Sequence, residues 1–120
     1  MSKSTTQKGQ EAEEIAAAYL ESKEYLILDR NYRFERAEID IVAFDHKQVI
    51  FVEVKARATT YFGHPEEYVT PDKEKNIKKA AEAWIYERKM ETALVRFDIV
   101  SIVQQNGKAP DISHFEDAFR

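Results

Sequence analysis

The chain has 120 residues, of which 43% are hydrophobic and 33% charged, with no cysteine and a formal net charge of −4. This length suits one domain with a single core, and the composition excludes wholesale disorder, a disulfide scaffold and a membrane-spanning helix. The acidic total argues weakly against a nucleic-acid partner, although a local basic surface can coexist with it. The first ten residues lack the apolar stretch of a secretory signal, so we expect a cytoplasmic protein.

We expect residues 1–8 to be disordered and residues 9–120 to form the single domain. The first expected element is a helix over Gln7–Lys23, because apolar residues recur there at helical spacing. Glu13 lies at the edge of that apolar stripe, so its carboxylate can reach in beside the core. A solvated or capping glutamate is the alternative for this residue.

A strand is predicted next over residues 25–32, which read YLILDRNY, and a polar turn follows. Three arginines in this region suit either contacts with phosphates or an ordinary solvated turn: Arg30, Arg33 and Arg36.

Two strands with strict alternation come after this turn, EIDIVAFD from Glu38 to Asp45 and VIFVEVKAR from Val49 to Arg57. In the first, one face is predicted to carry Glu38, Asp40, Val42 and Phe44. In the second, one face is predicted to carry Val49, Phe51, Glu53, Lys55 and Arg57. Each of these faces combines apolar and ionisable side chains, so each strand is expected to run between a core and a polar site.

The loop between these strands sets their register. A hairpin centred on His46-Lys47 pairs residues whose numbers sum to 93, which places Asp40 opposite Glu53. Carboxylates about 5 Å apart repel by roughly 3 kcal/mol at an effective dielectric near 20, more than a favourable cross-strand pair returns. The pair therefore predicts a bound cation or a shared proton. An ion-pair cluster around Lys55, or a bulge that breaks the register, is the alternative.

The segment from Ala58 to Val69 is expected to be an irregular loop that faces a substrate. His64 in this loop has no second histidine at ligand spacing, so we exclude it from the metal site. Leu94 to Val103 is rich in β-branched residues and predicts a central or next-to-central strand. Asp111 to Phe119 is expected to add a short edge strand or a tail helix.

Thr70-Pro71-Asp72 predicts the start of a second helix, with an N-cap hydroxyl, a proline at the first position and an acid in the first turn. The first two turns carry four lysines, where the helix dipole disfavours cations: Lys73, Lys75, Lys78 and Lys79. This conflict indicates either an anionic partner or ordinary solvated lysines.

The order helix, three strands, helix, strand, with Asp40 ending the second strand and Glu53-Val54-Lys55 in the third, resembles the PD-(D/E)XK nuclease superfamily. The longer strings GQEAEEIAAAYL, NYRFERAEIDIVAFD, VIFVEVKAR, FGHPEEYVTPDK and RFDIV resemble the YraN-like family of small bacterial proteins, over about Gly9 to Phe119. This family is similar to archaeal-type Holliday-junction resolvases. Three positions depart from it by lacking its usual glycine: Ala12, Glu24 and Ala37.

The resemblance implies an α/β fold of the α+β type, a restriction-endonuclease-like αβββαβ core whose mixed sheet is flanked by helices. It implies a metal-dependent endonuclease that hydrolyses phosphodiester bonds in DNA, including structured or branched DNA. The residues that it nominates for the active site are Asp40, Glu53, Lys55 and Glu13, with Glu38 as a supporting acid.

In this family-based interpretation, Asp40, Glu53, Glu13 and the carbonyl of Val54 hold Mg²⁺ or Mn²⁺. The metal polarises the phosphate and lowers the pKa of bound water, while Lys55 positions that water or stabilises the developing charge. Contacts with the nucleic-acid backbone are expected from Arg33, Arg57 and Lys73.

Two other functions stay open at this point. One is a non-catalytic nucleic-acid-binding module that retains the nuclease fold. The other is an interaction protein whose acidic residues pair with Lys55 and Arg57. The sequence also leaves open whether the chain acts alone or as a homodimer.

Overall fold

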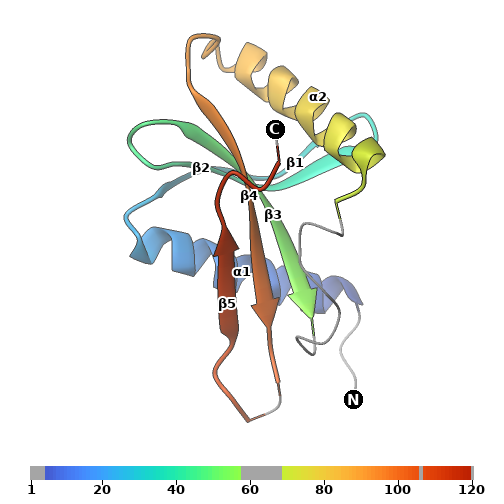
Figure 1. The fold of residues 1–120 in the computed structure, drawn as a ribbon, viewed down its shortest axis with the longest axis vertical. Coiled ribbons are helices and arrows are strands. Elements are labelled where there is room, and N and C mark those ends of the chain that lie inside the picture. Colours follow the sequence, from blue (N-terminus) through green and yellow to red (C-terminus); the bar gives the residue numbers. More distant parts are fainter. Residues whose placement is uncertain (1–4, 58–68, 106, 120) are drawn as a thin grey trace.

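The computed structural model describes residues 5–57, 69–105 and 107–119, with the backbone alone for residues 5–8. The elements are α1 (Thr5–Ser22), β1 (Leu26–Phe34), β2 (Ala37–Phe44), β3 (Val49–Arg57), α2 (Pro71–Glu87), β4 (Val95–Val103) and β5 (Asp111–Phe115) (Figure 1). Helix α1 thus begins at Thr5, within the segment predicted to be disordered. Most of the predicted substrate-facing loop, His64 included, lies outside the described residues.

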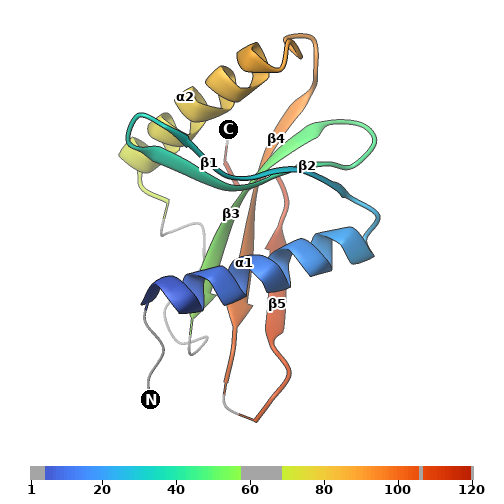
Figure 2. The same ribbon diagram turned by 180° about the vertical axis from the view of Figure 1, so that it is seen from behind.

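The five strands form one mixed sheet in the order β1-β2-β3-β4-β5. The central strands β3 and β4 pair in parallel, and the other three neighbouring pairs are antiparallel. The sheet is strongly twisted, because β1 and β2 run across the molecule while β4 and β5 run along it (Figure 2). This α+β arrangement confirms the predicted αβββαβ order, with β5 added as the predicted edge strand, and is consistent with a restriction-endonuclease-like core.

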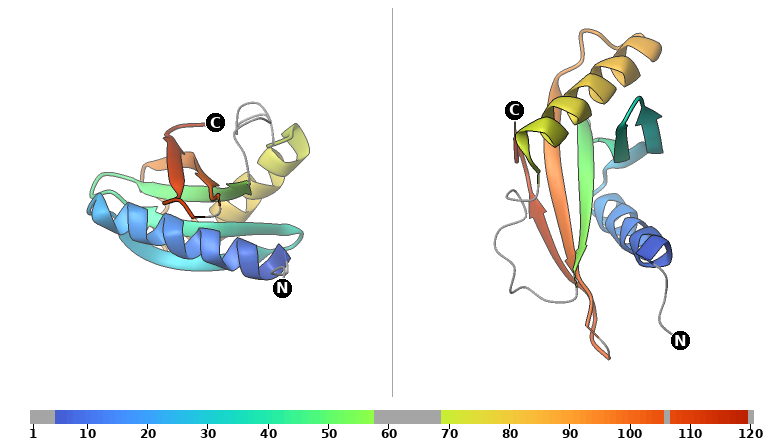
Figure 3. Two further views of the ribbon diagram at one scale, coloured as in Figure 1. Left: turned by 90° about the horizontal axis from the view of Figure 1, so that it is seen from below. Right: turned by 90° about the vertical axis from the view of Figure 1, so that its right-hand side faces the viewer.

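Helix α1 covers one face of the sheet through small helical side chains packed on branched strand residues. This α1 cluster consists of Ala12, Ala16, Ala17, Leu20, Ile41, Ala43, Ile50, Val52, Val100 and Ile102. Helix α2 covers the other face. Its α2 cluster consists of Ala37, Ile39, Val42, Val49, Phe51, Ile77, Ala80, Ala81 and Trp84. Consecutive β3 residues alternate between the two clusters, which confirms the predicted alternation of that strand. Figure 3 shows the β1–β2 hairpin between the two helices.

The β2–β3 hairpin has the predicted register. Its described pairs run from Phe44–Val49 to Ile41–Val52, and the residue numbers of each pair sum to 93. The ladder ends at Ile41–Val52, so Asp40 and Glu53 lie just beyond the last pair, where the two strands part. This end of the hairpin holds the candidate site.

The predicted common face of Glu38, Asp40, Val42 and Phe44 is wrong. Val42 belongs to the α2 cluster and Phe44 packs against it, whereas Glu38 and Asp40 lie beside Glu13 of α1. The change of face falls between Asp40 and Ile41, because Ala37 and Ile39 belong to the α2 cluster whereas Ile41 and Ala43 belong to the α1 cluster. At the same level of the sheet, Asn31 of β1, between the pairs Arg30–Ile41 and Tyr32–Ile39, has a left-handed φ of 54°.

The predicted start of α2 is confirmed. Thr70 is the N-cap, its hydroxyl oxygen accepts a hydrogen bond from the backbone N–H of Lys73 at 3.2 Å, and Pro71 is the first helical residue. Strand β1, by contrast, extends to Phe34, so Arg33 lies in the strand and not in the predicted turn. Neither helix of the described residues is long and apolar enough to cross a membrane.

A buried carboxylate joins β4 to β5 and to the C-terminal segment. Asp98 is 0% exposed and accepts two hydrogen bonds from Arg96, both at 2.8 Å, and one from the backbone N–H of Asp117 at 3.0 Å. His114 on β5 is the third partner of Asp98, with its Nε2 at 2.7 Å from Asp98 Oδ2. Burial alone would raise the pKa of Asp98, but the hydrogen bonds from His114 and Arg96 outweigh burial and lower it.

Candidate functional site

Asp40 occupies the point at which β2 and β3 separate. Its Oδ2 accepts a hydrogen bond from the backbone N–H of Val54 at 2.8 Å. The Asp40 side chain therefore replaces the backbone as the partner of β3 just after the ladder ends at Ile41–Val52. This bond fixes one carboxylate oxygen, and a side-chain hydrogen bond joins the carboxyl group to Glu13.

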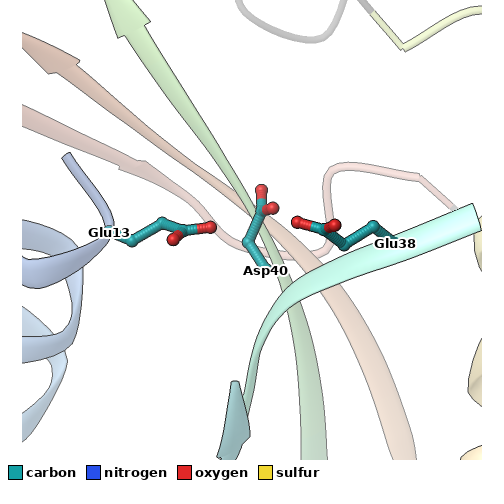
Figure 4. Close-up of side chains that lie close together, drawn as sticks. All are labelled: Glu13, Glu38 and Asp40. Carbon is teal, nitrogen blue, oxygen red and sulfur yellow. The ribbon is translucent and has the colours of Figure 1, made fainter. Parts of the chain in front are cut away.

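Two further carboxylates converge on Asp40. Glu13 comes from α1 and Glu38 from β2, and one oxygen of each of the three residues lies within 4.8 Å of the others. Figure 4 shows the carboxyl groups of Glu13 and Glu38 pointing toward Asp40 from opposite sides. Glu13 reaches this position because Ala12 and Ala16, its neighbours along the helix, are buried against the sheet. We call Glu13, Glu38 and Asp40 the acidic cluster.

Each outer member of the acidic cluster has a partner that orients it. With its amide nitrogen turned toward Glu13, Asn31 donates to both carboxylate oxygens, at 2.8 and 3.2 Å. Glu38 forms an ion pair with Arg33, whose Nη2 lies 2.9 Å from Oε2. The role of Asn31 was missed by sequence reasoning, because a single asparagine within a strand-like run gives no signal of a positive φ.

The acidic cluster carries more negative charge than its surroundings neutralise. Burial, and then the charge of Glu53, raise the pKa of Asp40 to about 8, although the Val54 N–H acts in the opposite direction. Burial, and then the charge of Glu38, also raise the pKa of Glu13. Such a group of acids either shares protons or binds a cation.

Glu53 lies beside the acidic cluster, held by a different partner. Its Oε1 forms an ion pair with Nζ of Lys73, in the first turn of α2, at 2.7 Å. The Glu53 side chain is 11% exposed and that of Lys73 39%, so the carboxylate is largely shielded from solvent while the lysine is partly open to it. The structure thus brings Glu13, Glu38 and Asp40 together, and the charge of Glu53 still acts on Asp40. The metal-binding role of Glu53 stays a prediction.

The remaining predicted residues continue along β3. Lys55 lies opposite Ser101 of β4, and Arg57 lies opposite Val103, so both follow Glu53 at the same end of the strand. Their catalytic and phosphate-binding roles, and that of the Val54 carbonyl, also stay predictions.

A pocket of about 460 Å³ opens over the acidic cluster. Besides the three carboxylates, it is lined by Gly9, Gln10, Ala12, Asn31, Arg33, Val54 and Ala56. Its volume falls within the range of small-molecule sites, and its walls combine hard oxygen ligands with one guanidinium group. The arrangement can hold a divalent cation and admit a phosphate group beside it.

The sequence model of the family described as "Uncharacterised protein family UPF0102" matches residues 12–102, a range that includes the acidic cluster. The chain belongs to the UPF0102 family. A UPF0102 protein of Geobacter sulfurreducens is 46% identical to it over 111 residues, which cover 92% of this chain and 87% of the relative. A UPF0102 protein of Geotalea daltonii is 44% identical over the same length and the same shares. One of Chlorobium phaeobacteroides is 44% identical over 117 residues, which cover 93% of this chain and 92% of the relative.

UPF0102 membership confirms the family that the sequence strings indicated. The relatives' names describe no reaction, so the chemistry of this UPF0102 chain is argued from its site. Placement in the PD-(D/E)XK superfamily is consistent with the fold.

Proposed function

We propose that this UPF0102 protein is a metal-dependent endonuclease that hydrolyses phosphodiester bonds in DNA, including structured or branched DNA. The observation that carries the proposal is the convergence of Glu13, Glu38 and Asp40 within 4.8 Å, at the point where β2 and β3 part. The nuclease resemblance leads us to expect a site where β2 and β3 separate, next to the Glu-x-Lys sequence Glu53-Val54-Lys55 on β3.

The donor set fits a hard divalent cation. The acidic cluster offers carboxylate oxygens alone, which are the ligands that Mg²⁺ and Mn²⁺ prefer. The raised pKa of Asp40, caused first by burial and then by the charge of Glu53, supports the same conclusion, because a bound cation would stabilise the charged carboxylate against both. Glu13, Glu38 and Asp40 would hold the metal, with Glu53 and the Val54 carbonyl beside them. When bound, a metal of this kind polarises the phosphate and lowers the pKa of bound water.

Around the metal, residues of the chain would bind the phosphate group and stabilise its charge. Arg33 lines the pocket and is 80% exposed, so its guanidinium can leave Glu38 for a phosphate oxygen. Lys55 would position the attacking water or stabilise the charge that develops on the phosphate. The bond from Val54 keeps Asp40 in place during these steps.

A second candidate function is a nucleic-acid-binding module without catalysis. The ion pair between Glu53 and Lys73 favours it, because this pair directs Glu53 to an ammonium group instead of the acidic cluster.

The test is cleavage of labelled linear, flapped and four-way-junction DNA in Mg²⁺ or Mn²⁺. We expect cleavage by the wild type and its loss in Asp40→Asn and in Lys55→Ala. Glu14→Gln is the matched control, because Glu14 follows Glu13 on α1 but pairs with Arg30 outside the acidic cluster. DNA binding without cleavage would favour the non-catalytic module. Mn²⁺ binding that is equal in the wild type and Asp40→Asn would contradict the metal site itself.

A further inference from the structure

Lys73 is held in place at both its backbone and its side chain. The Thr70 hydroxyl accepts a hydrogen bond from its backbone N–H, and its Nζ lies 2.7 Å from Glu53 Oε1. The Lys73 side chain therefore links the first turn of α2 to β3. The next residue of β3, Val54, donates its backbone N–H to Asp40.

The first turn of a helix is an unfavourable place for a cation. The N-terminal end of the helix dipole and its unpaired backbone N–H groups favour anions there. Asp72 and Glu74, the neighbours of Lys73 in this turn, follow that rule. An ammonium group in this position needs a compensating anion, and Glu53, with its 11% exposed side chain, provides it.

Glu53 also acts on the acidic cluster. Asp40 and Glu53 both lie just beyond the last pair of the β2–β3 ladder, and the charge of Glu53 is the second cause, after burial, of the raised pKa of Asp40. A divalent cation bound at Asp40 would attract the same Glu53 carboxylate that Lys73 now holds. Because the bound Glu53 oxygen cannot serve both cations fully, the ammonium and the metal compete.

We propose that Lys73 is an internal counter-ion that holds Glu53 until a divalent cation enters, and that the released ammonium then binds a backbone phosphate of the nucleic acid. This inference rests on the proposed function and adds a regulatory coupling to it. Lys73 is already 39% exposed in the ion pair and lies at a helix N-terminus, where an anion is favoured. Metal binding would thus create a phosphate-binding group, and by linkage nucleic acid would strengthen metal binding.

The first test is Mn²⁺ binding by calorimetry, without nucleic acid. Lys73→Met removes the charge and keeps an unbranched side chain, and we expect it to bind Mn²⁺ about fivefold more tightly than the wild type. Lys75→Met is the matched control, because Lys75 is exposed on the same turn region of α2, and its Mn²⁺ affinity should stay unchanged. Equal or weaker Mn²⁺ binding by Lys73→Met would overturn the proposal.

The second test measures the coupling. Ca²⁺ supports binding without requiring cleavage, so the affinity for a labelled DNA duplex is compared in Ca²⁺ and in EDTA at constant ionic strength. We expect Ca²⁺ to strengthen binding by the wild type about fivefold or more, and to have no such effect on Lys73→Met. An equal Ca²⁺ effect in both proteins would contradict the release of Lys73.

A third measurement needs no variant. In the wild type labelled with ¹³C, the Lys73 side-chain methylene signal should shift during a Mg²⁺ titration, as the ion pair opens. A constant signal at saturating Mg²⁺ would overturn the inference even if Lys73→Met fails to fold.

These outcomes separate the inference from the proposed function. If the wild type binds no Mn²⁺, both fail. If Asp40→Asn abolishes Mn²⁺ binding but Lys73→Met leaves it unchanged, the metal site stands and only the counter-ion role of Lys73 fails.

Discussion

At the scale of single residues, Asp40 combines two functions in one carboxylate. One oxygen takes the place of the β2 backbone in accepting the N–H of Val54, and the group as a whole forms the centre of the acidic cluster. Asparagine can reproduce the first function, because its amide oxygen still accepts a hydrogen bond, but it removes the charge needed for the second. Asp40→Asn is therefore the substitution that separates structure from metal binding.

The raised pKa of Asp40 predicts how stability depends on pH without metal. The pKa rises from 3.8 to about 8 on folding, so the folded chain binds this proton more tightly than the unfolded chain. The free energy of unfolding should therefore fall as the pH rises from about 4 to about 8, and level off above. Each pKa unit corresponds to about 1.4 kcal/mol, so the loss should reach a few kcal/mol.

Urea unfolding in EDTA at pH 5 and pH 8.5 measures this effect, with the single tryptophan, Trp84, as the fluorescent reporter. Asp40→Asn should be less dependent on pH and more stable than the wild type at pH 8.5. An equal pH dependence in both proteins would contradict the raised pKa.

Asn31 supports the site through both its backbone and its amide. Asn31→Gly removes the hydrogen bonds to Glu13 but suits a φ of 54°, whereas Asn31→Ala also strains the backbone. We expect both variants to bind Mn²⁺ more weakly than the wild type, and only Asn31→Ala to lose about 1 kcal/mol of stability. Calorimetry and urea unfolding measure the two effects. Unchanged Mn²⁺ affinity in Asn31→Gly would show that the amide does not orient Glu13.

At the scale of elements, one buried carboxylate, Asp98, reinforces the attachment of β5 beside its ladder with β4. Asp98→Asn would leave Arg96, which is 13% exposed, without its main counter-ion, while keeping the shape of the side chain. Breaking a buried ion pair in this way costs about 3–5 kcal/mol. Guanidinium unfolding should show that loss, whereas Asp111→Asn, at an exposed position of β5, should stay within about 0.5 kcal/mol of the wild type. A small effect of Asp98→Asn would mean that water replaces the lost partner.

Local sequence signals predicted those elements whose geometry is local. The even loop at His46-Lys47 fixed the register of the β2–β3 hairpin, because a two-residue turn leaves little choice in pairing. The hydroxyl of Thr70 and the ring of Pro71 likewise defined where α2 begins. The carboxylates of the acidic cluster were predicted too, Glu13 and the supporting acid Glu38 through the family resemblance.

The features that sequence reasoning missed depend on neighbouring strands. The change of face in β2 lies level with the left-handed Asn31 in β1, and the alternating sequence of β2 contains no trace of it. The pair of Asp40 and Glu53 was expected from register, but the Asp40 side chain competes with the backbone for Val54 and the ladder stops first. The partner of Glu53 was equally hidden, because Lys73 approaches from α2, twenty positions further along the chain.

At the scale of the whole molecule, a net charge of −4 must be reconciled with the proposed binding to DNA. The proposed phosphate contacts come from three residues, Arg33, Arg57 and Lys73. Each contact releases counterions, so log K should fall against log salt with a slope of about −2.7 in Ca²⁺. Arg33→Met should reduce the magnitude of that slope by about 0.9.

Fluorescence anisotropy with a labelled duplex between 50 and 200 mM salt, concentrations at which the effect is large, gives the slope. Lys89→Met is the control, because Lys89 is exposed beyond the far end of α2. An equal loss of slope in both variants would indicate that contacts with DNA are spread over the surface and not gathered near the acidic cluster.

The parallel pairing of β3 with β4 has a consequence for the order in which the protein is made. All three members of the acidic cluster, and the Val54 N–H that holds Asp40, precede β4 in the chain and are therefore synthesised before it. Until β4 arrives, the apolar β3 is an unprotected edge that can pair with other chains. The N-terminal half therefore contains the acidic cluster but lacks a means of staying soluble, and a fragment ending at Arg57 should aggregate instead of forming a minimal metal-binding domain.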